Sequence, residues 1–230
     1  MPEIQGILFD KDGTLFDFNA TWGAWTRSFL IAETGGDAAL VRRLAEALGY
    51  DLEREAFERD SIVIAGTVED VSGAALPFLP ETSQTALIAR MNAQTADVPQ
   101  VEVTPLVPFL LGLSARGLDL GIATNDSEYP ARAQLRAAGV EQSFDFIAGY
   151  DSGFGGKPST GQLDAFASTL GLNPAHCAMV GDSLHDLHAG RAAGFVTVGV
   201  LTGVATAQDL APAADVILPS IAHLPDWLDD

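Results

Sequence analysis

The chain of 230 residues is poor in several features, beginning with cysteine, of which it has one. A single cysteine cannot form an internal disulfide, which excludes a disulfide-stabilised secreted scaffold and fits a reducing compartment. No apolar run reaches the roughly 20 residues that span a bilayer. The first residues lack a basic segment followed by an apolar one, so we expect a cytoplasmic protein without a signal peptide.

Basic residues are also scarce: 12 Lys and Arg stand against 31 Asp and Glu, for a net charge of -19. Such a surface repels nucleic acid and anionic membranes, so we expect neither as a partner. It repels phosphate compounds as well, and a phosphate site in this chain therefore needs local positive charge. The 47% hydrophobic content allows a sizeable core. Cys177 lies in an apolar run, which indicates a core residue rather than a nucleophile.

Short apolar runs alternate with segments of helical periodicity over most of the chain. We predict strands at residues 4–9, 118–123, 144–148, 178–180, 196–200 and 216–218, with helices between the later ones. This alternation predicts an α/β fold, a doubly wound parallel sheet with helices on both faces.

One block breaks that alternation. Residues 18–100 have helical periodicity almost throughout, including stretches near 52–64 and 81–92. We interpret them as an all-helical cap inserted after the first strand, above a core formed by residues 1–17 and 101–230. A cap in that place would act as a lid. The alternative is an unrelated helical domain tethered nearby.

Two acids, Asp10 and Asp12, end the first predicted strand within the sequence LFDKDGTLFD. Open α/β sheets bind ligands at the carboxyl ends of their strands. Burying acids there is costly unless a cation or a proton compensates them, so the pair indicates a divalent metal, covalent chemistry, or both. Asp10 is a candidate nucleophile and metal ligand, and Asp12 a candidate proton donor and acceptor. The alternative is a surface turn rich in Asp and Gly.

Polar residues follow the later strands too. Thr124 and Asn125 can hydrogen-bond phosphate oxygens without adding charge, although a helix N-cap is another use for such residues. The chain has only two lysines, Lys11 and Lys157. Lys157 follows a glycine-rich loop and is a candidate partner for an anion. A solvated loop lysine is the alternative for Lys157.

A fourth signal comes late in the chain. Asp182 ends a buried strand as Asp10 does, and Asp186 lies one helical turn further on. Their carboxylates can point at one spot and, with water, suit Mg²⁺. A lone N-cap is the alternative for such an Asp. His185 and His188 lack the spacing of a zinc site, and we expect them at the surface or at a helix end.

Taken in this order, the four motifs resemble those of the haloacid dehalogenase-like hydrolase superfamily, and the resemblance covers nearly the whole chain. It implies that Asp10 attacks phosphorus to form an aspartyl-phosphate and that Asp12 serves as general acid and then base. It also implies that Thr124, with the Asn125 backbone, holds phosphate oxygens, and that Lys157 neutralises the phosphate and positions Asp10.

The same resemblance implies a magnesium site. Asp10 and the backbone carbonyl of Asp12 would bind Mg²⁺, Asp182 would complete the site, and Asp186 would bind directly or through water. Phosphoryl transfer depends on positioning and charge stabilisation, which agrees with this set of residues.

Within the superfamily, Asp12 separates the branches. Dehalogenases lack an acid there, and the phosphonatases also lack it and use a cap lysine, whereas residues 18–100 contain no lysine. What remains resembles the phosphoglycolate phosphatase-like group with a helical cap. We therefore expect a phosphomonoesterase acting on a small phosphorylated metabolite, with phosphoglycolate as one candidate.

Three other functions stay open. A phosphosugar mutase would share the core motifs, a phospho-acceptor signalling module would use clustered acids on a similar sheet, and a relative could have lost catalysis. In the cap, Trp22, Trp25 and Arg27 are candidates to contact the leaving group, although aromatics at helical spacing are more often core. A monomer and a homodimer are both compatible with the sequence.

Overall fold

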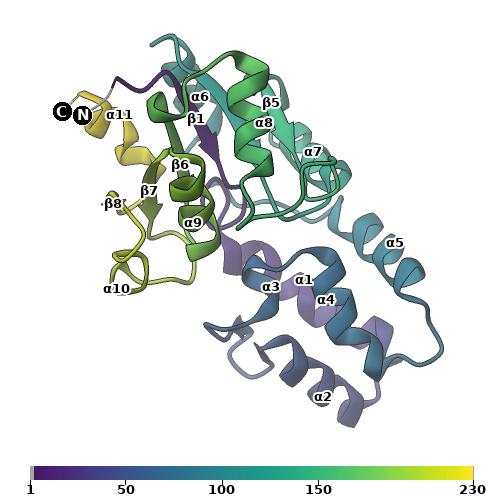
Figure 1. Cartoon of the computed structure of the whole chain (residues 1–230). Helices are drawn as coiled ribbons and strands as arrows, with labels where there is room; N and C mark the ends of the chain where they lie inside the picture. Colours follow the sequence, from purple (N-terminus) through teal and green to yellow (C-terminus); the bar gives the residue numbers. More distant parts are fainter. Residues whose placement is uncertain (1–2, 230) are drawn as a thin grey trace.

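The computed structural model describes residues 3–229, and at its centre is a six-stranded parallel sheet (Figure 1). Its order is β5-β4-β1-β6-β7-β8. The strands are β1 (Gly6–Phe9), β4 (Asp119–Ala123), β5 (Phe146–Ala148), β6 (Cys177–Gly181), β7 (Val196–Val200) and β8 (Val216–Leu218). The predicted doubly wound sheet is confirmed. Residues 1, 2 and 230, at the ends of the predicted core, lie outside the described residues.

Alternation along the strands sends side chains into two separate helical layers. Ile7 and Phe9 of β1 belong to the hydrophobic cluster that includes side chains of α6 (Leu106–Ser114), α7 (Glu128–Ala137) and α11 (Leu224–Asp229). Leu8 points the other way, into a cluster with α8 (Gly161–Leu170) and α9 (Leu184–Ala193). The short α10 (Ala207–Leu210) follows β7. Strands β1 and β6 are thus buried on both faces, whereas β8 at the edge of the sheet is only partly buried.

The central strands β4, β1 and β6 are parallel neighbours, so their carboxyl ends meet at one edge of the sheet. The residues that directly follow these strands are Thr124, Asp10 and Asp182. The topology therefore brings three of the four sequence motifs to one place.

The helices that follow β1 gather beyond this edge (Figure 1). They are α1 (Phe18–Glu33), α2 (Ala38–Leu48), α3 (Ile62–Ala65), α4 (Val68–Ala75) and α5 (Gln84–Thr95). Their apolar faces form a hydrophobic cluster separate from those of the sheet, with Phe29, Leu44 and Leu87 fully or almost fully buried in it. The Asp17 side chain caps α1 by accepting a hydrogen bond from the Ala20 amide.

Within this block the prediction of a helix near residues 52–64 is wrong over most of its length. A hairpin of β2 (Tyr50–Asp51) and β3 (Ala56–Phe57) takes its place, and α3 begins only afterwards. The Asp51 carboxylate accepts hydrogen bonds from the amides of Glu53 and Arg54 at 2.8 and 3.0 Å, and Glu55 has a positive φ of 51°. This local turn competes with helix formation in a stretch of weak apolar periodicity.

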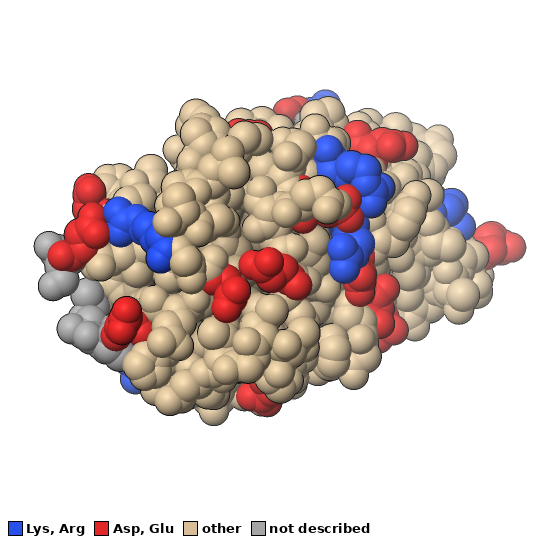
Figure 2. Space-filling view, turned by 90° about the horizontal axis from the view of Figure 1, so that it is seen from above, with Lys and Arg blue, Asp and Glu red and all other residues tan. Residues whose placement is uncertain are grey.

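The predictions that Cys177 is a core residue and that His185 and His188 lie at the surface are confirmed. Cys177 is fully buried in β6, and His185 and His188 are exposed on α9. None of the helices in residues 3–229 is both long and apolar enough to cross a membrane. On the face in Figure 2, acidic side chains lie in small groups, several of them beside basic ones, on a largely uncharged surface.

Candidate active site

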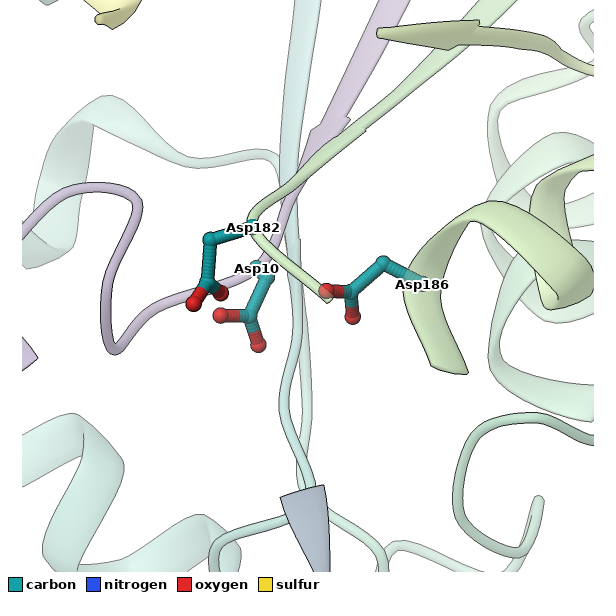
Figure 3. A group of neighbouring side chains, drawn as sticks. All are labelled: Asp10, Asp182 and Asp186. Atoms are coloured by element: carbon teal, nitrogen blue, oxygen red, sulfur yellow. The ribbon is translucent and has the colours of Figure 1, made fainter. Parts of the chain in front are cut away.

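Three acids converge at the carboxyl edge of the sheet. One carboxylate oxygen from each of Asp10, Asp182 and Asp186 lies within 4.8 Å of the others. Asp10 and Asp182 directly follow the adjacent strands β1 and β6, and Asp186 belongs to the first turn of α9. Their side chains point toward a common spot (Figure 3). The predicted meeting of these three residues therefore occurs.

Glycines make room for this convergence. A Cβ atom at Gly13 or at Gly203 would collide with the Asp182 carboxylate, and Gly13 also has a left-handed φ of +79°. A Cβ atom at Gly181 would collide with Asp186 in the same way. The close approach of backbone to carboxylate thus requires glycine here.

Lys157 lies among these acids and is itself buried. Its Nζ is 2.7 Å from Asp10 Oδ1 and 2.6 Å from Asp186 Oδ1. The other oxygen of Asp186 accepts hydrogen bonds from the Ser183 amide and hydroxyl at 3.0 and 2.7 Å, which forms a capping box at the start of α9. Asp186 thus takes part in the capping box as its third helical residue and belongs to the acidic group at once, while its binding of a metal stays a prediction.

One lysine cannot balance three buried acids. Burial raises the pKa of Asp10 to about 7, with Lys157 opposing the rise and Asp186 and Asp12 adding to it. Burial also raises the pKa of Asp182 well above its usual range, and the charges of Asp10 and Asp186 add to this effect. The group therefore needs more positive charge to stay ionised, and a hard divalent cation with oxygen ligands fits this donor set.

Thr124 and Asn125 lie beside this group, at the end of β4. Thr124 is buried, and its Oγ1 accepts a hydrogen bond from the Asp126 amide at 3.1 Å. The Asn125 side chain has a role that the sequence did not reveal. Its Oδ1 accepts from the Lys157 amide at 2.8 Å, while its Nδ2 donates to the carbonyls of Lys157 and Ala65 at 2.9 and 2.7 Å. Asn125 thus fixes the backbone of Lys157 and ties it to α3.

We expect Asn125→Ala to lower kcat/KM by about 10- to 100-fold, because small displacements of a charged group at a reacting centre cost that much. The loss of three partly buried hydrogen bonds should also lower the melting temperature. Steady-state kinetics and thermal unfolding measure both effects. Asn173→Ala is a matched control, since the Asn173 side chain accepts a hydrogen bond from the Ala175 amide before β6. Equal kcat/KM in the two variants would contradict this role for Asn125.

A second buried lysine, Lys11, lies next to Asp12. Its Nζ is 2.5 Å from Asp12 Oδ2 and 3.0 Å from Asp126 Oδ2, and it donates to Gln134 Oε1 at 2.6 Å. The Trp22 Nε1 of α1 donates to Asp12 Oδ1 at 2.8 Å, and the ring centre of Trp22 is 5.5 Å from the lysine nitrogen. The Asp12 carboxylate is therefore held by Lys11 and Trp22, apart from the three-acid group.

This arrangement tunes Asp12. Burial raises the pKa of Asp12 to about 6, Lys11 and the Trp22 hydrogen bond hold it down, and Asp126 raises it. Burial by itself would lower the pKa of Lys11, but Asp12 and Asp126 raise it overall, so the lysine keeps its charge. A carboxyl group that titrates near neutral pH suits general acid and base catalysis. The sequence signal was a lysine between two strand-end acids in a chain with only two lysines.

A cavity lies between the sheet edge and the helical block. All the predicted site residues line it: Asp10, Asp12, Thr124, Asn125, Lys157, Asp182 and Asp186. Trp22 and Trp25 line it from α1 and also pack in the hydrophobic cluster of the helical block, so they are core residues, and their contact with a leaving group stays a prediction. Arg27, the third such candidate, is not among the lining residues; it is about half exposed and pairs with Glu55.

Comparison with known proteins gives concordant results. Residues 4–194 match a family model described as haloacid dehalogenase-like hydrolase. A phosphoglycolate phosphatase of Neisseria meningitidis is 36% identical, covering 97% of this chain and 93% of the relative. A phosphoglycolate phosphatase of Rhodospirillum rubrum is 30% identical, covering 97% and 90%. The crystal structure of a predicted phosphoglycolate phosphatase from Haemophilus somnus superposes with a TM-score of 0.73 at 18% identity, covering 99% of both chains, which shows the shared fold.

Proposed function

Because the chain belongs to the haloacid dehalogenase-like hydrolase family and is a phosphoric monoester hydrolase, we propose that it works through an aspartyl-phosphate on Asp10 and depends on Mg²⁺. The observation that carries the proposal is the buried group of Asp10, Asp182 and Asp186 around Lys157, in the same cavity as Asp12 and Thr124. A nucleophile, a proton carrier and a cation for the phosphate are thus within one site.

The proposed reaction has two steps. Asp10 attacks phosphorus, the ester P–O bond breaks, and the leaving alkoxide takes the proton of Asp12. Water then attacks the phosphoryl group, Asp12 accepts a proton from that water, and inorganic phosphate leaves Asp10 free again. Lys157 offsets the charge of the phosphate, and the Thr124 hydroxyl and the backbone N–H of Asn125 donate hydrogen bonds to its oxygens.

The residues that would hold Mg²⁺ are Asp10, Asp182 and Asp186, with the backbone carbonyl of Asp12. The fit rests on the surplus of buried carboxylates over positive charge in this group. When bound, the ion would supply positive charge for the phosphate oxygens. We further propose that residues 18–100 act as a cap, since the hydrogen bond from Asn125 to Ala65 links the helical block to the site.

Mg²⁺ should stabilise the protein more at about pH 8 than at about pH 5.5. The raised pKa of Asp10 and of Asp182 means that the folded protein binds these protons more tightly than the unfolded chain. The free energy of unfolding of the metal-free protein therefore falls as pH rises from the ordinary value of 3.8 through about 7. Bound Mg²⁺ offsets the free-energy cost of keeping these acids ionised in the folded protein. At low pH, protons compete with Mg²⁺ for the carboxylates.

At a concentration of about 100 times its Kd, Mg²⁺ should add roughly 2.7 kcal/mol, or about 5–10 °C in melting temperature. Thermal unfolding with MgCl₂ or EDTA at both pH values measures this. Asp182→Asn should lose most of the response. Asp145→Asn, at an acid that directly precedes β5 and accepts a hydrogen bond from the Leu120 amide, should keep it. A response that is the same at both pH values would contradict the assignment.

Hydrolysis of 4-nitrophenyl phosphate with Mg²⁺ and with EDTA tests the function itself. We expect release of nitrophenolate and inorganic phosphate that depends on Mg²⁺. Release of inorganic phosphate without any added sugar bisphosphate also argues against a phosphosugar mutase. Absence of any release by the folded protein would sink the proposal. Phosphoglycolate should be tested next as a substrate, because the relatives are named phosphoglycolate phosphatases.

A further inference from the structure

We infer that the phosphate ester this protein hydrolyses has an uncharged, largely apolar leaving group, and that a carboxylate-bearing one such as that of phosphoglycolate is disfavoured. The inference rests on the proposed function, because it concerns the part of the same cavity where the leaving group would lie. It follows from the side chains that the helical block contributes to the cavity and from those that it withholds.

The cap side of the cavity is lined mainly by apolar side chains. They are Phe18, Trp22, Trp25, Val63, Ile64, Val68, Val71 and Met91. Phe18, Trp22, Val71 and Met91 are each less than 7% exposed, so this wall is well shielded from water. An apolar group gains roughly 25 cal/mol for each Å² that it buries against such a wall, whereas an unpaired carboxylate loses its hydration there without replacement.

Five of the six arginines of the helical block have partners outside this cavity. Arg43 lies over the ring of Phe78 at 5.3 Å, Arg59 is 3.7 Å from Asp209, and the other three pair with acids of the block itself. Arg27 pairs with Glu55, Arg54 with Asp51 at 2.6 Å, and Arg90 with Glu33 at 2.5 Å. None of the described residues that line the cavity is an arginine, and the one lysine among them is Lys157. A second anionic group on the substrate would thus find no guanidinium partner there.

The positive charges near the site are already engaged. Lys157 bonds Asp10 and Asp186, and Lys11 bonds Asp12 and Asp126. Asp126 itself lines the cavity, so its carboxylate would repel a substrate carboxylate. His185 also lines it but is exposed, so water and salt screen any charge it carries.

The uncharged polar groups on this wall are partly committed to each other. The Ser127 hydroxyl donates to Asn92 Oδ1 at 3.1 Å, and the Thr95 hydroxyl donates to the Asn92 carbonyl at 3.3 Å. They leave the wall able to accept a neutral group of limited polarity. They provide no replacement for a cation.

Isobutyl phosphate and phosphoglycolate form a matched pair of substrates. Both leaving groups have the same number of non-hydrogen atoms in the same branched arrangement, and they differ in that two methyl groups replace two carboxylate oxygens. Phosphate release would give kcat/KM for each, and calorimetric titration of the Asp10→Asn variant would give each Kd. We expect isobutyl phosphate to be favoured by about 100-fold or more in either measurement.

A preference of less than about 3-fold, or any preference for phosphoglycolate, would overturn the inference, because it would mean that the wall accepts a carboxylate. Failure of the proposed function would look different: neither these esters nor 4-nitrophenyl phosphate would be hydrolysed in a way that depends on Asp10. The two Kd values would still compare the leaving groups in that case, and the same criterion would apply to them.

A cation placed on the wall should change the preference. Ile64 of α3 is half-buried and lines the cavity, so Ile64→Lys can bring an ammonium group toward the leaving group. We expect this variant to raise kcat/KM for phosphoglycolate relative to isobutyl phosphate by about 10-fold or more. Ile64→Met, of similar length but uncharged, should leave the ratio near that of the wild type. An unchanged ratio in Ile64→Lys would contradict the inference.

Discussion

Asp10→Asn is expected to lower turnover of any phosphate ester by at least about 10⁴-fold while leaving the fold intact. The amide cannot act as the nucleophile, and no other carboxylate occupies the end of β1 beside Lys157 among the described residues. The substitution also removes one of three buried acids whose ionisation is unfavourable, as the raised pKa of Asp10 shows. The melting temperature of the Asp10→Asn variant without Mg²⁺ should therefore equal or exceed that of the wild type.

Asp12→Asn provides the matched comparison, since it makes the same replacement of a carboxylate by an amide two residues further along the chain. With 4-nitrophenyl phosphate, whose leaving group needs no proton, the first step should still proceed and the second should stall for lack of a base. We expect a burst of nitrophenolate that approaches one per enzyme molecule and a phosphoryl group retained on Asp10. Activity that persists in purified Asp10→Asn would mean that another residue is the nucleophile. A burst in the double variant Asp10→Asn/Asp12→Asn would mean the same.

The sheet was predictable because its strands are visible in the sequence as short, largely apolar segments. Short, largely apolar segments such as residues 196–200 and 216–218 indicate strands, and the structure has β7 and β8 at those bounds. The meeting of Asp10 with Asp182 followed from the same pattern, since parallel strands end at one edge.

What the sequence could not reveal depends on contacts between distant segments. The hairpin at Tyr50–Asp51 and Ala56–Phe57 depends on hydrogen bonds of one carboxylate, which outweigh a faint helical periodicity. The bond from Asn125 to Ala65 joins residues 60 positions apart. No local pattern encodes such a pair, so the role of the Asn125 side chain emerged only from the structure.

Lys11 illustrates the same limit within the strongest motif of the chain. Its neighbours Asp10 and Asp12 could be assigned from their place after β1, but its own partners Asp126, Gln134 and Trp22 come from three other segments. A lysine between two acids is also common on solvated turns. Its complete burial and its ion pair with Asp12, which lines the cavity, place its charge beside the site.

Lys11→Met should destabilise the protein and shift its pH dependence, and both effects have one cause. Without the ammonium group, Asp12 and Asp126 face each other with no positive charge between them. Removing one partner of a buried ion pair costs about 3 kcal/mol or more, somewhat reduced here because Asp126 is partly exposed. Chemical denaturation at about pH 7 would measure this loss as a fall in the free energy of unfolding.

The pH effect follows from the role of Asp12. Formation of the phosphoenzyme from an alkyl phosphate requires ionised Asp10 and protonated Asp12. At saturating Mg²⁺, which would keep Asp10 ionised, kcat/KM falls as pH rises through the pKa of Asp12, which is about 6 with Lys11 in place. An opposite charge at this distance lowers a carboxyl pKa by about 1–3 units, and its removal must raise the pKa of Asp12. The alkaline limb of the kcat/KM profile should therefore move up by about one pH unit or more.

The double variant Lys11→Met/Asp126→Asn separates the two effects. It removes one positive and one negative charge, so much of the lost stability should return, yet Asp12 still lacks its cation and the alkaline limb should stay displaced. Lys11→Arg, which keeps the charge, should leave that limb nearly in place even if the larger side chain costs stability. An alkaline limb that moves only in step with lost stability would mean that Lys11 supports the fold alone. A limb that follows the charge at position 11, whatever the stability, would assign Lys11 to the positioning and tuning of Asp12.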